Sequence, residues 1–175
     1  MKSILLKQAA TCGLYIGLAL IVVSLLDYLF GFYGQNKVFN LISYVIMIVG
    51  IAWATIWYRD KDLGGFVTYG QAVSFGVVLS ACFGIVSAVF VILLTTVIAP
   101  EYMERALEIT YDKLLEKGTI SEDQADAMIA MSKKLANPIF TFFTSILGSV
   151  IMGLVISLIS SIFIKKNPPV TSDIN

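Results

Sequence analysis

The sequence predicts an all-α, polytopic membrane protein with four transmembrane helices and an extramembrane amphipathic helical hairpin between the third and the fourth. Of its 175 residues, 58% are hydrophobic and 14% are charged, whereas soluble domains have about 45–50% apolar and about 25% charged residues. Four apolar stretches also reach the about 20 residues with which an α-helix crosses a bilayer. We therefore expect one membrane domain over residues 1–175, with the hairpin as an insert over 99–138.

The first apolar stretch, residues 9–30, follows Lys2 and Lys7 and so resembles the start of a signal peptide. It is longer than the about 7–15 residues of a signal-peptide core. The segment LLDYLFGFYG at its end also lacks a cleavage pattern of small residues. We expect this stretch to remain in the protein as a membrane span.

The other three spans are expected at residues 38–58, 71–98 and 139–164. Aromatic rings with a polar edge prefer the headgroup region of a bilayer, and they gather where the first two spans end. These rings are Tyr28, Phe30, Phe32 and Tyr33 beside the first span, and Trp53, Trp57 and Tyr58 in the second. They indicate interfacial anchors, with a stacking site for a ligand as the alternative.

Small residues recur at every fourth position in three of the spans, which places them on one face of each helix. In a bilayer, side chains of this size let two backbones approach closely, and such close packing drives helix association. We expect helix-packing faces made of Gly13 and Gly17 in the first span, Gly76, Ser80, Gly84 and Ala88 in the third, and Ser145, Ser149, Gly153 and Ser157 in the fourth. A polar path lined by the hydroxyls of the fourth span is the alternative, although serines in such helices usually bond to their own backbone.

Two polar residues in the spans are candidate functional residues. Asp27 is the one carboxylate within the expected spans, where an ionised aspartate costs about 2.5–3.5 kcal/mol at the bilayer centre. It lies in the last turn of the first span, close enough to the interface to reach water, and binding of a proton or a coupling ion is the alternative. Gln71 opens the third span and is expected to be an interfacial hydrogen-bond donor rather than a ligand.

The 99–138 segment carries the signals of two helices. Pro100 stops or kinks the third span, and Gly118 is a natural end for the first helix of the insert. That helix has an apolar stripe made of Met103, Leu107, Tyr111 and Leu114. Ser121 and Gln124 have the spacing of a capping box, and Asn137-Pro138 breaks the hairpin before the last span. The apolar faces of this hairpin could meet each other, the lipid surface or a partner.

The positions of lysine and arginine indicate the orientation, because cytoplasmic loops carry an excess of these residues near the spans. Short segments on the side of both termini contain Lys2, Lys7, Arg59, Lys61, Lys165 and Lys166. The other side also has six cations, Lys37 and five in the insert, but they are spread over a longer stretch of sequence. The 99–138 insert has eight carboxylates against five cations. We expect both termini to be cytoplasmic and the insert to lie on the outer side of the cytoplasmic membrane.

The composition argues against several classes of protein. Lysine plus arginine equals aspartate plus glutamate at 12 each, so no charge surplus indicates nucleic-acid binding, and the chain has no histidine. Cys12 and Cys82 lie in apolar runs, where cysteine behaves as a small hydrophobic residue. The sequence has no nucleophile–base pair, metal-ligand spacing or phosphate-binding glycine loop. We therefore expect no enzymatic activity, no metal and no cofactor.

Four segments resemble a family of small bacterial membrane proteins known as domain of unknown function 4199: GGFVTYGQAVSFGVVLSA, IAPEYMERALE, GTISEDQADAMIAMSKKLANP and GSVIMGLVISLISSIFIKKNP. The resemblance runs over nearly the whole chain. It implies four membrane helices with a helical insert before the last, in the cytoplasmic (inner) membrane of bacteria with a cell envelope. It implies no activity and no catalytic residues.

The partners expected from these features are the lipid bilayer and another membrane or envelope protein, or a second copy of the chain as a homo-oligomer. The leading hypothesis is a non-enzymatic adaptor or accessory subunit of a cell-envelope complex, which binds through the hairpin or the small-residue faces. The alternative is a small oligomeric transporter or lipid-handling protein, in which Asp27 and the serines of the fourth span would matter.

Overall fold

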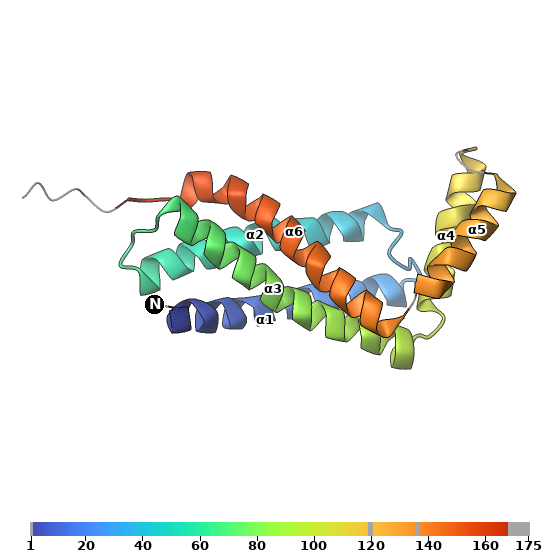
Figure 1. Cartoon of the computed structure of the whole chain (residues 1–175), viewed down its shortest axis with the longest axis horizontal. Coiled ribbons are helices and arrows are strands. Elements are labelled where there is room, and N and C mark those ends of the chain that lie inside the picture. The colour runs from blue at the N-terminus through green and yellow to red at the C-terminus, as the bar shows by residue number, and fades with distance from the viewer. Residues whose placement is uncertain (1, 119–120, 136, 168–175) are drawn as a thin grey trace, which may run out of the picture.

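The computed structural model describes residues 2–118, 121–135 and 137–167. Six α-helices and one π-helix follow one another along these residues. Their bounds are α1 Lys2–Leu29, α2 Lys37–Asp62, α3 Tyr69–Leu93, η1 Leu94–Ile98, α4 Tyr102–Glu116, α5 Glu122–Leu135 and α6 Pro138–Ile164. Helices α1, α2, α3 and α6 form a bundle, and α4 and α5 lie beyond one of its ends (Figure 1). We call that end the α4 end, and we call the end where α1 begins and α6 stops the terminal end.

The four helices of the bundle are long and apolar enough to cross a membrane. α2 and α6 contain their expected spans, and α1 ends one residue before the expected end of the first span. α1 and α2 extend several residues past the expected spans at their charged ends, because a helix continues into polar residues until the backbone is interrupted. α1 begins at Lys2, and α2 continues through charged residues to Asp62. α2 ends where Gly64 and Gly65 take positive φ values of 64° and 87°, a conformation that glycine adopts without steric cost.

The third span differs from a continuous α-helix in its last turn. The α-helix ends at Leu93, and residues 94–98 form the π-helix η1, closed by a bond of 2.7 Å from the Ala99 N–H to the Leu94 carbonyl. In the same turn the Thr95 and Thr96 hydroxyls donate to the carbonyls of Val91 and Ile92 at 2.8 and 2.7 Å. Such side-chain bonds compete with the regular ladder and bend helices.

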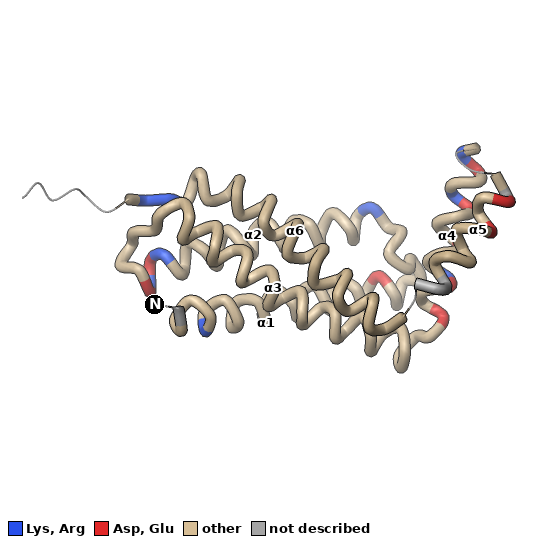
Figure 2. Tube along the Cα trace, in the orientation of Figure 1, with Lys and Arg blue, Asp and Glu red and all other residues tan. Residues whose placement is uncertain are grey.

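The bundle buries hydroxyl groups and exposes apolar side chains. Four hydroxyl residues are at most 1% exposed: Thr55, Ser80, Ser157 and Ser161. On the outside, Phe163 is 83% exposed and Ile159 is 59% exposed. Charged residues gather toward the two ends of the bundle and on α4 and α5, and the middle has almost none (Figure 2). An extended apolar surface of this kind suits a protein surrounded by lipid.

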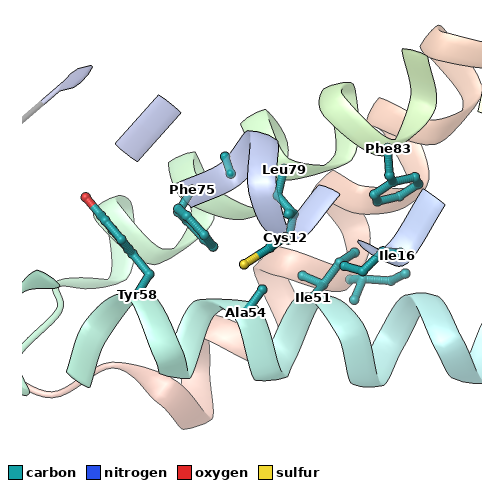
Figure 3. Packing of buried hydrophobic residues seen from close by; sticks show 10 residues of the cluster. Cys12, Ile16, Ile51, Ala54, Tyr58, Phe75, Leu79 and Phe83 are labelled. Carbon is teal, nitrogen blue, oxygen red and sulfur yellow. The ribbon is translucent and has the colours of Figure 1, made fainter. Parts of the chain in front are cut away.

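The buried core joins all four long helices (Figure 3). Cys12 of α1 is fully buried there, and both cysteines are free thiols. Tyr58 also belongs to this core: it is 3% exposed, and its ring stacks on Phe75 with 4.4 Å between centroids and 4° between ring planes. The expectation that Tyr58 anchors α2 at the membrane interface is therefore wrong. Helical spacing puts Tyr58 on the inward face of α2 with Ile51 and Ala54.

The terminal end is closed by backbone contacts between segments far apart in the sequence. Val67, before α3, and Lys166, after α6, exchange two N–H···O bonds of 2.9 Å each. The guanidinium of Arg59 in α2 donates to the Ile164 carbonyl at 3.2 Å. The bond from Arg59 satisfies a carbonyl at the end of α6 that has no partner within its own helix.

Candidate functional site

The small residues of α3 and α6 face each other in antiparallel register. Each step of four residues forward along α3 matches a step of four backward along α6. The facing pairs are Gly76 with Ser157, Ser80 with Gly153, and Gly84 with Ser149. The same register places Ala88 opposite Ser145. We call this contact the α3–α6 seam.

In the seam, each glycine provides the space that the facing serine occupies. A Cβ atom added to Gly84 would lie 2.9 Å from the Cβ of Ser149, and one added to Gly76 or Gly153 would overlap the facing serine. The hydroxyl of Ser80 donates to the Gly76 carbonyl at 2.7 Å, and that of Ser149 donates to the Ser145 carbonyl at 2.8 Å. These two serines thus satisfy their hydroxyls on their own helices while their side chains fill the glycine notches.

The glycines of α1 face α3 as well. A Cβ atom at Gly13 would lie 2.7 Å from the Cβ of Cys82 and 3.1 Å from the backbone nitrogen of Phe83. A Cβ atom at Gly17 would lie 2.9 Å from the Cβ of Val86. Helix α3 therefore contacts glycines of α1 on one side and small residues of α6 on the other.

Asp27 lies at the α4 end of the bundle, and its carboxylate is buried rather than open to water. The residue is 4% exposed, because the connection between α1 and α2 folds back over it. Tyr33 and Gly34 in this connection have positive φ values of 49° and 79°, and the Gly34 N–H donates to Asp27 Oδ2. Asp27 Oδ1 is buried without a hydrogen-bond partner among the described residues.

Three tyrosines cluster at this connection. The ring centroids of Tyr28, Tyr33 and Tyr102 lie 5.7 to 6.1 Å apart, and the Tyr28 hydroxyl donates to Glu101 Oε1 at 3.3 Å. Burial, and then the nearby Asp27 carboxylate, raises the pKa of the Tyr102 phenol above its ordinary value. The phenol therefore stays protonated at neutral pH and can act as a hydrogen-bond donor beside Asp27.

Helix α4 is bonded to this connection through Gln35. The Gln35 amide nitrogen donates to Thr110 Oγ1 at 2.8 Å, and the Lys113 amine donates to the Gln35 carbonyl oxygen at 3.4 Å. Gln35 was not among the residues expected to be functional. Its partners lie 75 and 78 residues away along the chain, so no local pattern reveals the contact.

Gln71 is part of the N-terminal cap of α3, at the terminal end and away from Asp27. Its side-chain oxygen accepts bonds of 3.0 and 3.1 Å from the backbone nitrogen and hydroxyl of Thr68. The Thr68 hydroxyl in turn accepts from the Gln71 N–H at 3.4 Å. This is a capping box, and the spacing Thr-x-x-Gln is the signal that could have identified it from the sequence. The side chain of Gln71 therefore accepts hydrogen bonds, and it caps the N-terminus of α3.

Helices α4 and α5 enclose a cleft of about 310 Å³ beyond the α4 end. It is lined by Glu108, Tyr111, Asp112, Leu115, Ala125, Asp126 and Ile129. Across it, the hydroxyl oxygens of Tyr111 and Ser132 lie 3.0 Å apart, at hydrogen-bond distance. The expected capping box at the start of α5 is confirmed, because Ser121 N–H donates to Gln124 Oε1 at 3.0 Å and Gln124 N–H to Ser121 Oγ at 3.4 Å.

The cleft presents three carboxylates, those of Glu108, Asp112 and Asp126, above apolar side chains. Within the described ranges, no three histidine, cysteine, aspartate or glutamate residues are grouped so that they could hold a metal ion. The arrangement can therefore attract a cationic group by charge and bury an apolar one beside it.

Comparison with known proteins places the chain at the level of a family. No curated protein and no solved structure matches the chain significantly. The model of a family described as protein of unknown function (DUF4199) matches residues 11–166, which include all of α2 to α6 and most of α1. The chain therefore belongs to the DUF4199 family.

Proposed function

We propose that the protein is a non-enzymatic adaptor in the bacterial cytoplasmic membrane, and that α4 and α5 bind a basic segment of another cell-envelope protein. The observation that carries this proposal is the cleft between the two helices. Its seven lining residues include three carboxylates and no lysine or arginine. Glu108 is paired with Arg105 at 3.6 Å, so Asp112 and Asp126 are the carboxylates that would meet a cation of the partner. A partner with a cation flanked by an apolar side chain would be complementary to this cleft in charge and in polarity.

The attachment of α4 supports the same role. The hydrogen bonds from Gln35 to Thr110 and from Lys113 to Gln35 attach α4 to the α4 end of the bundle. On α5, Met128 and Met131 remain 44% and 64% exposed, and methionine adapts readily to irregular binding surfaces. In this amphipathic hairpin, α4 would hold the binding surface in place at the bundle, and α5 would provide a surface that adapts to a partner.

Partner binding is tested by affinity purification of the full-length protein from its own membrane in a mild detergent. We expect a stoichiometric partner, which the double variant Asp112→Lys with Asp126→Lys no longer retains. Glu116→Lys is the matched control, because Glu116 is an exposed carboxylate of α4 outside the residues that line the cleft. Recovery of the chain alone, or equal loss of the partner in the control, argues against the proposal.

We also propose that both termini are cytoplasmic and that α4 and α5 lie on the outer side. Arg59, Lys61, Lys165 and Lys166 gather at the terminal end, which supports this orientation. Labelling of intact cells with a membrane-impermeant maleimide tests it in a chain whose native cysteines are replaced. Lys117→Cys should react in intact cells, and Lys165→Cys should react only after lysis. The reverse pattern would place the cleft in the cytoplasm.

A small oligomeric transporter or lipid-handling protein is the second candidate, and one observation favours it. Asp27 is buried, and its Oδ1 atom has no hydrogen-bond partner in the part of the chain that the structure describes. Carboxylates buried within membrane helices often mark the pathways of transported ions or substrates. Proton flux into vesicles that contain the purified protein tests this role. Flux that Asp27→Asn abolishes supports transport, and flux no higher than in empty vesicles argues against it.

A further inference from the structure

We propose that the outer surface between α1 and α2 binds one anionic phospholipid, with an acyl chain in a groove between the helices and the phosphate at Lys61. The proposal goes beyond the adaptor role and rests only on these helices crossing a bilayer. Three features support this binding site: the groove itself, the side chains of Trp53, Trp57 and Lys61 on α2, and the length of α2 that the groove and these side chains cover.

The groove lies between the middle parts of α1 and α2 and has a volume of about 350 Å³. It is lined by Tyr15, Ile16, Ala19, Val45, Ile46, Val49, Gly50 and Trp53. Tyr15 and Val49 are 62% and 59% exposed, so the groove opens to the surroundings of the bundle. Its size falls in the range of about 300–1,000 Å³ that is typical of ligand sites, and its walls suit a hydrocarbon chain.

The groove exists because α1 and α2 do not present matching small residues to each other. The glycines Gly13 and Gly17 of α1 face α3 instead. The close contact with α2 is made by Gly50, where an added Cβ atom would lie 3.0 Å from Ile16 Cδ1. Around this contact, larger side chains hold the two helix surfaces apart and leave the space open.

A row of aromatic rings leads from the groove to a lysine. Trp53 lines the groove and stacks on Trp57, with 5.6 Å between centroids and 11° between planes. The amine of Lys61 lies 4.6 Å from the centroid of Trp57. These residues are spaced by four positions and therefore share one face of α2.

Lys61 is the cation of this helix end that remains available to a phosphate. Its neighbour Arg59 is paired with Asp60 at 2.7 Å and also donates to the Ile164 carbonyl. Within the described residues, no carboxylate forms an ion pair with Lys61. A phosphate at this position would neutralise the amine at the depth where lipid headgroups lie.

The length of the site matches one lipid leaflet. From Val45 to Lys61, α2 rises by ~24 Å at about 1.5 Å per residue. Half of a bilayer that is about 40–45 Å thick with its headgroups measures ~20–22 Å. A helix from a second copy would fit the groove equally well, but an apolar helix would offer the Lys61 amine no anionic group. The charge and the length together therefore favour an anionic phospholipid.

The two tryptophans of the chain, Trp53 and Trp57, are both in the proposed site, so their fluorescence reports its occupancy. Purified full-length protein is reconstituted in phosphatidylcholine vesicles that contain a small fraction of brominated phosphatidylglycerol or, separately, brominated phosphatidylcholine. Bromine quenches tryptophan on contact. We expect the association constant for the anionic lipid to exceed that for the zwitterionic lipid about fivefold, the size expected of one lysine at a membrane surface.

Matched variants decide which part of the site is responsible. Lys61→Ala should abolish the preference, whereas Lys166→Ala should keep it, because Lys166 lies over a different ring, that of Phe66, at 5.5 Å. Val49→Phe fills the groove and should reduce the preference to less than twofold. Leu147→Phe, at a position of α6 that is also 59% exposed, should not.

Three results would overturn the proposal. Equal quenching by both brominated lipids would remove the charge preference. An equal effect of Lys61→Ala and Lys166→Ala, or of Val49→Phe and Leu147→Phe, would assign the preference to the membrane surface in general. Protection of both tryptophans from both lipids would show that a protein helix, from a second copy or another chain, covers the groove.

Discussion

The α3–α6 seam and the α1–α2 pair are both contacts between two long apolar helices, yet they pack in different ways. In the seam, glycines and serines of the two helices alternate so that each glycine faces a serine. Between α1 and α2, Gly50 meets a larger side chain, that of Ile16, and a groove of about 350 Å³ remains. Matching series of small residues on both helices therefore give close packing along the α3–α6 contact, whereas a single glycine facing a large side chain leaves space beside it.

The largest expected effect comes from filling a notch of the seam. Gly153→Leu adds bulk where the backbone of α6 meets Ser80, and overpacking of this kind costs about 1–3 kcal/mol. We expect a clear drop in the melting temperature of the protein in detergent. Gly148→Leu is the control on the same helix, because no atom lies within 4 Å of a Cβ added there. Equal drops would mean that the seam is not tightly packed.

The next largest loss of stability is expected at the α4 end of the α1–α2 pair, where hydrogen bonds rather than small residues fix the connection between the two helices. Asp27→Leu removes the acceptor for the Gly34 N–H, and leaving a buried donor without a partner costs about 1–3 kcal/mol. Asp27→Asn keeps an acceptor oxygen and should preserve most of the melting temperature. If both variants melt alike, the bond to Gly34 does not stabilise this end.

A smaller effect is expected when the serine and the glycine of one facing pair are exchanged, and it is measured as the interaction free energy between the two positions. Ser80→Gly and Gly153→Ser each disturb the seam, by leaving a void or by setting two serines against each other. The double variant restores one glycine facing one serine. Residues in contact typically couple by about 0.5–3 kcal/mol. The double variant should therefore lose less stability than the two single variants lose when their losses are added. Simple additivity in thermal melting would show that the pairs act independently.

The smallest effect is expected at Gly50, the glycine of the α1–α2 pair. Gly50→Ala meets only the flexible Ile16 side chain, at 3.0 Å, and alanine stabilises a helix interior by about 0.5–1 kcal/mol relative to glycine. The net change in melting temperature should therefore be close to zero. Gly84→Ala is the contrast in the seam, because its Cβ would lie 2.9 Å from the Cβ of Ser149. A loss at Gly50 as large as that at Gly84 would remove the difference between the two regions.

Local patterns were sufficient for much of the fold. Stretches of hydropathy located the four long helices, and the spacing of Ser121 and Gln124 identified the start of α5. Gly118, with a φ of 63°, follows the end of α4 as expected. Each of these features depends on residues within a few positions of one another, so the sequence displays them directly.

The candidate sites were less accessible to such reasoning, because they depend on contacts between distant segments. Asp27 was expected near water, but the folding back of residues 30–36 buries it. Gln35 contacts Thr110 across 75 residues of sequence. The tryptophans of α2 can be read from the sequence, but the groove beside them depends on the distance between α1 and α2.

The sequence by itself determined the class of protein, the long helices and the faces on which small residues lie, because hydropathy and helical period act along the chain. Only the tertiary structure decided which faces meet. It matched the glycines of α3 with the serines of α6 and turned the glycines of α1 toward α3. The physical reason is that close packing depends on the shapes of two surfaces together, and a periodic pattern on one helix does not specify its partner.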